Sequence, residues 1–182
     1  MVVKPSIKIN IPNRDDVYLR LYNEKDLREY YNLIDRDRTH LKVFQLWAID
    51  TDYEKTRQNM IENIQGIKQG TRLSYFLVNS PIDKIIGSIN IRNINITDAS
   101  AYMGYWISEE FEGRGIVHDA IATLMDYMSD SKNINRIILE IAPENIRSQN
   151  LAKRLGANPT GKFTDGSMPG RPTRTEVWEI KL

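Results

Sequence analysis

Hydrophobic positions along this chain change their spacing several times, and each change predicts the boundary of an element. Alternating apolar and polar residues indicate strands with one buried face, whereas apolar residues three and four apart indicate amphipathic helices. Gly, Pro, Asn and Asp at the boundaries supply turns and helix caps. The pattern predicts, in order, a strand at Val17–Leu21, a helix from Asn23 to about Thr39, a helix from Thr51 or Asp52 to Gly70, strands at Leu73–Val78, Lys84–Arg92 and Ala101–Ser108, a helix from about Gly115 to Ser129, a strand at Arg136–Ala142, a helix from about Arg147 to Leu155 and a strand at Glu176–Leu182.

This order of elements predicts a mixed α/β (α+β) fold. Consecutive strands form an antiparallel meander, and the later alternation of strand and helix adds a second half. A chain of 182 residues suits one domain, residues 1–182, that buries about 70% of its unfolded surface. We expect the first two helices to form a lid over a substrate. The Gly- and Pro-rich segment Gly161–Pro172 is long for a connection, so we expect a mobile loop that borders the functional site.

Composition narrows the classes of function. The net charge is +1 and the pI is near 7.9, so no global field would recruit nucleic acid or an anionic membrane. Cysteine is absent, which excludes a disulfide scaffold and a cysteine nucleophile, and neither His40 nor His118 has the spacing of a zinc site, so we expect no metal. The chain shows neither a signal-peptide pattern nor an apolar run of about 18 residues, so a cytoplasmic protein is expected.

A glycine-punctuated turn follows the third strand of the meander and runs into an amphipathic helix. Gly113 and Gly115 would let backbone N–H groups approach a ligand closely, and the free amides at the start of the next helix favour an anion. The same glycines would also suit an ordinary strand-to-helix turn. The turn alone therefore allows a phosphate site without requiring one.

A second segment, Ile137–Gly156, combines a β-branched strand, a polar turn and a helix closed by Gly156. Together, GYWIS…EGRGIV and A-x-E-N-x-x-S-x-x-L-A-x-R-L-G resemble the motifs of the GNAT acetyltransferases, within them the branch that acetylates ribosomal-protein N-termini. The segment Arg36–Trp47, with R-x-R-T-H-L…W, is similar to the substrate-side helix and loop of that branch. The resemblance covers most of the chain.

The resemblance implies a fold and a co-substrate. The fold would have a central bent sheet, mixed but mostly antiparallel, with helices on both faces. Two strands, Ala101–Ser108 and Arg136–Ala142, would splay apart, and the pantetheine arm of acetyl-CoA would fill the gap. The residues implied in CoA binding are Ile107, Ser108, Glu112, Gly113, Arg114, Gly115, Ile116, Val117, Asn145 and Ser148.

Two residues of the implied diphosphate loop depart from the family pattern. Glu112 replaces Gln or Arg and places a carboxylate near two phosphates, while Val117 replaces a small residue. The acids of this region could simply favour the start of the next helix, with Arg114 as their counter-charge. Asn145 could bind pantetheine or only form the turn after Pro143, and Ser148 could cap its helix as well as act in catalysis.

Aminolysis of a thioester requires donors for an oxyanion and an acid for the departing thiolate. By resemblance, Ser148 would supply that proton. The strand 101–108 offers no carboxylate as a general base. The resemblance to the ribosomal-protein branch implies an acidic residue in the loop after the last helix, where Asp165 is the expected base, and Glu140 is the other candidate. An α-amino group has a pKa of about 7.7–8.0 against about 10.4 for lysine, so an N-terminal amine needs only a weak base.

By resemblance to the family's acceptor cleft, Trp47 and Tyr105 are the expected contacts to the acceptor, although aromatic residues such as Trp47 also suit a core. The sequence thus predicts acetyl transfer from acetyl-CoA to a primary amine in a ternary complex, with a protein or peptide N-terminus as the leading acceptor. A small amine, such as a polyamine or an antibiotic, is the alternative acceptor. An acyl-CoA-binding module without catalysis and a domain for another nucleotide are the alternative classes. The sequence leaves open whether the chain forms a homodimer.

Overall fold

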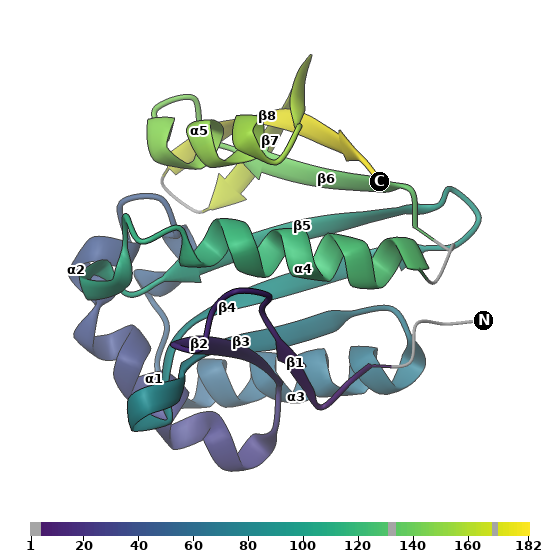
Figure 1. The fold of residues 1–182 in the computed structure, drawn as a ribbon. Helices are drawn as coiled ribbons and strands as arrows, with labels where there is room; N and C mark the ends of the chain where they lie inside the picture. The colour runs from purple at the N-terminus through teal and green to yellow at the C-terminus, as the bar shows by residue number, and fades with distance from the viewer. Residues whose placement is uncertain (1–4, 131–133, 169–170) are drawn as a thin grey trace.

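A computed structural model describes residues 5–130, 134–168 and 171–182 (Figure 1). The principal helices are α1 (Leu27–Arg36), α2 (Arg38–Leu41), α3 (Tyr53–Gln69), α4 (Ile116–Asp130) and α5 (Ile146–Arg154). The strands are β1 (Lys8–Asn10), β2 (Val17–Leu21), β3 (Leu73–Asn79), β4 (Lys84–Asn95), β5 (Ser100–Ile107), β6 (Arg136–Ile141), β7 (Asn158–Met168) and β8 (Arg171–Lys181).

All eight strands join one sheet in the order β1-β2-β3-β4-β5-β6-β8-β7. Neighbouring strands run antiparallel except β5 and β6, which are parallel. The predicted mixed, mostly antiparallel sheet is therefore confirmed. In Figure 1, β6, β7, β8 and α5 lie together at one side of α4, apart from the meander.

Helices cover both faces of the sheet, as predicted, because strand side chains alternate between two apolar surfaces. One core packs α4 and α5 against the strands and contains Ile121 and Leu124, both fully buried. The other packs α1 and α3 over the opposite face and contains Ile34 and Met60. No helix in the described ranges is both long and apolar enough to cross a membrane.

The predicted helix between 51 and 70 is confirmed by the groups at its two ends. Asp52 is the N-cap, and its Oδ1 accepts a hydrogen bond of 2.7 Å from the Lys55 amide. Gly70 ends the helix in the left-handed region, with φ of 74°.

The helix expected after the polar groups Asn23–Asp26 begins as predicted, but the expectation that it continues unbroken to about Thr39 is wrong. The chain forms a 3-10 turn at Glu24–Asp26, then α1, and leaves helical geometry at Asp37 before α2. Arg36 donates to the Asp37 carboxylate at 2.7 Å and to the Ser108 hydroxyl at 2.8 Å. Such side-chain bonds at a helix end compete with continuation of the helical backbone.

Strands β5 and β6 separate after a short paired segment. Only Ser100, Ala101 and Tyr102 of β5 have partners in β6, although β5 continues to Ile107. Strand β6 keeps its antiparallel pairing with β8 along all six of its residues. The unpaired edge of β5 beyond Tyr102 confirms the predicted splay.

The mobile loop expected at Gly161–Pro172 is wrong, because most of this segment belongs to the β7–β8 hairpin. Phe163–Met168 pairs in register with Arg171–Glu176, while residues 169 and 170 lie outside the described residues. The Thr164 and Thr175 hydroxyls are 2.8 Å apart, and the Arg174 guanidinium lies 3.9 Å from the Phe163 ring centroid. Such cross-strand pairs stabilise an edge strand that contains Gly and Pro.

Strand β1, only three residues long, was also not predicted.

We expect Ile121→Ala to lower the free energy of unfolding by about 2–5 kcal/mol, because Ile121 is fully buried between α4 and the sheet. Urea unfolding followed by circular dichroism measures the change. The matched control is Ile82→Ala, since Ile82 is 59% exposed, and we expect it to change stability by about 0.5 kcal/mol or less. Equal losses in the two variants would contradict this assignment of the core.

Candidate active site

The loop before α4 presents unbonded backbone amides at the end of β5. Gly113 and Gly115 have φ of 74° and 73°, a left-handed geometry that favours glycine. Within the described part of the chain, no group accepts a hydrogen bond from the amides of residues 113–118. These amides and the positive end of the α4 dipole form a site suited to an anion.

Arg14 supports this loop from the start of the chain. Its Nη1 donates to the carbonyl of Arg114 and to Asp119 Oδ2, each at 2.9 Å. Asp16 holds the other side of the guanidinium at 3.1 Å. No sequence signal marked Arg14, because it lies 100 residues before its loop partner Arg114.

Glu112 turns its carboxylate onto two side chains from other elements, His40 and Arg147. His40 Nε2 of α2 lies 2.8 Å from Oε1, and Arg147 of α5 bonds the other oxygen. The expectation that Arg114 would be the counter-charge is wrong, because Arg114 donates to the Glu110 carbonyl instead. Sequence reasoning missed the role of His40 because it lies 72 residues before Glu112.

The other unusual loop residue, Val117, packs against the apolar core. Ile116 beside it is buried. At the other end of the loop, Ile107 and Ser108 are also buried, and the Ser108 hydroxyl accepts the hydrogen bond from Arg36. Their roles in CoA binding remain predictions.

Ser148 lies in the first turn of α5 without serving as its cap. Asn145 is the N-cap, and its Oδ1 accepts from the Ser148 amide at 3.1 Å. The Ser148 hydroxyl is 2.7 Å from the Tyr105 hydroxyl of β5. Burial raises the pKa of Tyr105, while the bond to Ser148 and the charge of Arg154 act in the opposite direction.

A second group of contacts lies on the side of β5 that faces the segment after α2. Gln45 Nε2 donates to the Tyr105 carbonyl at 3.2 Å, and the Trp47 indole donates to Gln45 Oε1 at 2.9 Å. Trp47 is 36% exposed, and its ring centroid lies 6.2 Å from that of Trp106. Trp47 and Tyr105 thus lie near one another, as the acceptor prediction requires, but that role remains a prediction. Gln45 was not foreseen.

The two candidate bases lie in different surroundings. Asp165 is exposed and pairs in register with Arg174 in the hairpin, so it is not in a loop as expected. Glu140 bonds Arg92 at 2.7 Å and accepts from the Thr164 hydroxyl at 3.1 Å. The structure does not bring Asp165 into contact with Ser148, and its assignment as base remains a prediction. Across the described residues, no cluster of three His, Asp or Glu side chains could hold a metal.

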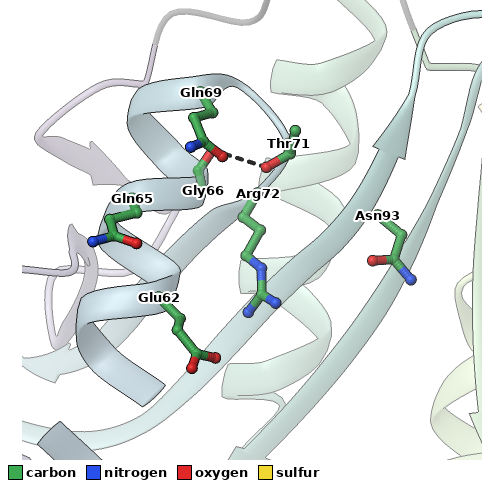
Figure 2. Close-up of a pocket in the computed structure, with 7 residues that line it drawn as sticks. All are labelled: Glu62, Gln65, Gly66, Gln69, Thr71, Arg72 and Asn93. Carbon is green, nitrogen blue, oxygen red and sulfur yellow. Dashed lines mark hydrogen bonds between the residues drawn. The ribbon is translucent and has the colours of Figure 1, made fainter. Parts of the chain in front are cut away.

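A surface pocket at the end of α3 is separate from these residues (Figure 2). Arg72 fills its centre and packs so closely on Gly66 that a β-carbon there would lie 2.7 Å from the arginine side chain. Asn93, on the opposite wall, is six residues along β4 from Gly87, which pairs with Ile107 beside the loop. Six strand residues span roughly 20 Å. The pocket therefore does not belong to the candidate site.

A separated strand pair beside a loop of free amides agrees with the matched sequence family. A family model described as an acetyltransferase (GNAT) domain covers residues 16–158. The chain belongs to the GNAT acetyltransferase family. The predicted enzyme class, an N-acetyltransferase, is thereby confirmed. The matched range includes β5, the loop, α4, β6 and α5, so every predicted CoA-binding residue lies inside the GNAT domain.

The GNAT domain is similar to several ribosomal-protein acetyltransferases. It is 32% identical over 159 residues to the [ribosomal protein uS5]-alanine N-acetyltransferase of Escherichia coli, covering 83% of this chain and 79% of the relative. Among solved structures, RimL, a ribosomal L7/L12 alpha-N-protein acetyltransferase in complex with coenzyme A, has a TM-score of 0.86 at 22% identity, covering 94% of this chain and 97% of that one. The microcin C7 self-immunity acetyltransferase MccE, in complex with acetyl-CoA and AMP, has a TM-score of 0.88 at 22% identity, with full coverage of both chains.

We expect Gly113→Ala to destabilise the chain by about 1–2 kcal/mol, because alanine disfavours the left-handed geometry even though a β-carbon would meet no atom there. Gly104→Ala is the control, since Gly104 in β5 also has open space around it but no positive φ. It should be neutral or stabilising.

Calorimetric titration with CoA supplies the second measurement for these two glycine variants. If the loop binds the diphosphate through its amides, we expect Gly113→Ala to raise the Kd for CoA about tenfold. A change of this size corresponds to the loss of one hydrogen bond to a charged group. Unchanged affinity in a folded Gly113→Ala protein would contradict the assignment of the loop.

Proposed function

We propose that this enzyme transfers the acetyl group of acetyl-CoA to a primary amine, with the α-amine of a protein or peptide N-terminus as the natural acceptor. The observation that carries the proposal is the loop 113–118, whose free amides lie at the open end of the gap between β5 and β6. The diphosphate of the donor would lie on these amides, and the pantetheine arm would bond the unpaired edge of β5.

The residues of this chain fit the proposed donor. Gly113 and Gly115 keep the loop amides exposed, and Arg14 fixes the loop from behind. The Glu112 carboxylate bonds the Arg147 guanidinium and lies 2.8 Å from His40 Nε2, so Arg147 pairs its negative charge beside the proposed diphosphate site. Acetyl-CoA and CoA occupy the related structures of MccE and RimL, respectively.

The chemistry proceeds by direct attack of a neutral amine on the thioester carbonyl. The tetrahedral oxyanion that forms needs an N–H donor, which the unpaired β5 edge can supply. Its collapse expels the CoA thiolate, and Ser148 is the proposed proton donor to the sulfur. Asp165 remains the proposed base, directly or through water.

Two observations favour an N-terminal acceptor. Several relatives are named as ribosomal-protein acetyltransferases, including the uS5-alanine N-acetyltransferase of Escherichia coli and the L7/L12 alpha-N-protein acetyltransferase RimL. In addition, no carboxylate contacts Ser148 or Tyr105 among the described residues, and an α-amine is the amine that requires the weakest base. We further propose that the reaction takes place in the cytoplasm, where such acceptors are made.

An acceptor screen tests the proposed reaction directly. We expect peptides that begin with Ser, Ala or Met to raise the release of CoA thiol from acetyl-CoA, measured with a thiol dye to which this cysteine-free chain adds no background. The same peptides with a blocked N-terminus, but with lysine present, are the control. Faster turnover with polyamines would move the assignment to a small-amine enzyme, and no turnover with any amine would contradict the proposed function.

Removal of the proposed acid and base tests the mechanism. We expect Ser148→Ala to lower kcat about 100-fold, as for loss of a general acid, and Asp165→Asn to lower it about tenfold. Steady-state kinetics with the best peptide measures both. The controls are Ser129→Ala and Asp126→Asn, since both residues are exposed on α4. A rate within threefold of the unmodified enzyme in either test variant would show that the assigned residue is wrong.

A further inference from the structure

Tyr105 joins the two sides of the gap between β5 and β6. Its hydroxyl lies 2.7 Å from Ser148 Oγ in α5, on the far side of the gap. Its backbone carbonyl accepts from Gln45 Nε2, on the acceptor side of β5. The side chain packs against the core beneath α4 and α5, whereas the next residue, Trp106, belongs to the core on the other face. Tyr105 thus has contacts on both the proposed donor side and the proposed acceptor side.

Both ends of the Tyr105–Ser148 contact are held in place. Asn145 bonds the Ser148 amide and fixes the first turn of α5. Gln45 bonds the Tyr105 carbonyl at a position where β5 has no β6 partner, so that segment of strand is not left without support. The two hydroxyls are therefore held in a fixed arrangement, which is the condition for efficient proton transfer.

The chemistry of the two hydroxyls indicates the direction of their hydrogen bond. Burial raises the pKa of Tyr105, so the phenol keeps its proton at neutral pH. A phenol is a stronger acid than an aliphatic alcohol, so Tyr105 is the better donor and Ser148 Oγ the better acceptor. In this arrangement the hydrogen of Ser148 is free to point at a second acceptor.

We propose that Tyr105 is a positioning residue for Ser148, directing the serine hydrogen at the sulfur of the donor and stabilising the charge that forms on the serine oxygen. This inference rests on the proposed acetyl transfer. As the carbon–sulfur bond of the tetrahedral intermediate breaks, its electron pair goes to sulfur and Ser148 gives its proton to the thiolate. The hydrogen bond from Tyr105 supports the developing serine alkoxide, which regains a proton from water. The proton lost by the amine goes to the proposed base Asp165, directly or through water, and from there to solvent, so the sum is amide and free CoA thiol.

Tyr105→Phe tests the inference, because it removes the hydroxyl and keeps the ring. We expect kcat to fall about tenfold, as for loss of one hydrogen bond to a developing charge. The KM for acetyl-CoA and the Kd for CoA should stay within about twofold, because the phenol acts only as the thiolate leaves. The matched control is Tyr102→Phe on the opposite face of the same strand, where the ring lies beneath the Arg92 guanidinium.

A double-mutant cycle supplies the readout that a merely structural role would not give. In a Ser148→Ala background, Tyr105→Phe should lower kcat by less than about twofold, because its only proposed partner is already absent. Additive losses would overturn the inference. An unchanged kcat in the Tyr105→Phe single variant would also overturn it. Tighter CoA binding in that variant would then indicate that the Tyr105–Ser148 contact obstructs the ligand. Absence of turnover in the unmodified enzyme would instead reject the proposed function, so the two failures are distinct.

Discussion

The separation of β5 from β6 is the constraint on which the site depends. A buried strand edge without a partner is costly, because each unpaired amide or carbonyl loses its hydrogen bonds to water. The sheet tolerates the break because β6 is fully paired to β8 on its other edge and β5 to β4 on its other edge. Gln45 satisfies one exposed carbonyl, at Tyr105. The remaining edge is available to an extended ligand, which a continuous sheet would exclude.

Side-chain contacts around the loop fix where its acidic residues lie. The acidic run before the loop contacts side chains from other elements: Arg36 bonds Glu110 at 3.3 Å, and His40 and Arg147 bond Glu112. Exposed ion pairs of this kind add little stability, about 0–1 kcal/mol each. Their effect is on orientation, since they hold the Glu110 carboxylate toward α1 and the Glu112 carboxylate toward α2 and α5.

Much of the fold could be predicted because strong periodicity and caps act locally. The bounds of α3 followed from Asp52 and Gly70, and the splay followed from a resemblance carried by two motifs. The break at Asp37 and the β7–β8 hairpin could not be predicted, because they depend on contacts such as Arg36 with Ser108 and Arg174 with Phe163. The same limit hid Arg14, His40 and Gln45 from the site, since each meets its partner only after the chain has folded.

At the start of α5, capping by Asn145 leaves the hydroxyl of Ser148 available for proton transfer. A serine in the first turn of a helix can satisfy a free amide, and a serine so engaged would be a poor proton donor. Here Asn145 takes that role toward the Ser148 amide, which leaves the Ser148 hydroxyl to Tyr105. In a helix that used this serine as its cap, the same hydroxyl could not both stabilise the helix end and donate a proton. The Asn at one position and the Ser three residues later remove that conflict, and they do so at the point where α5 meets the open edge of β5.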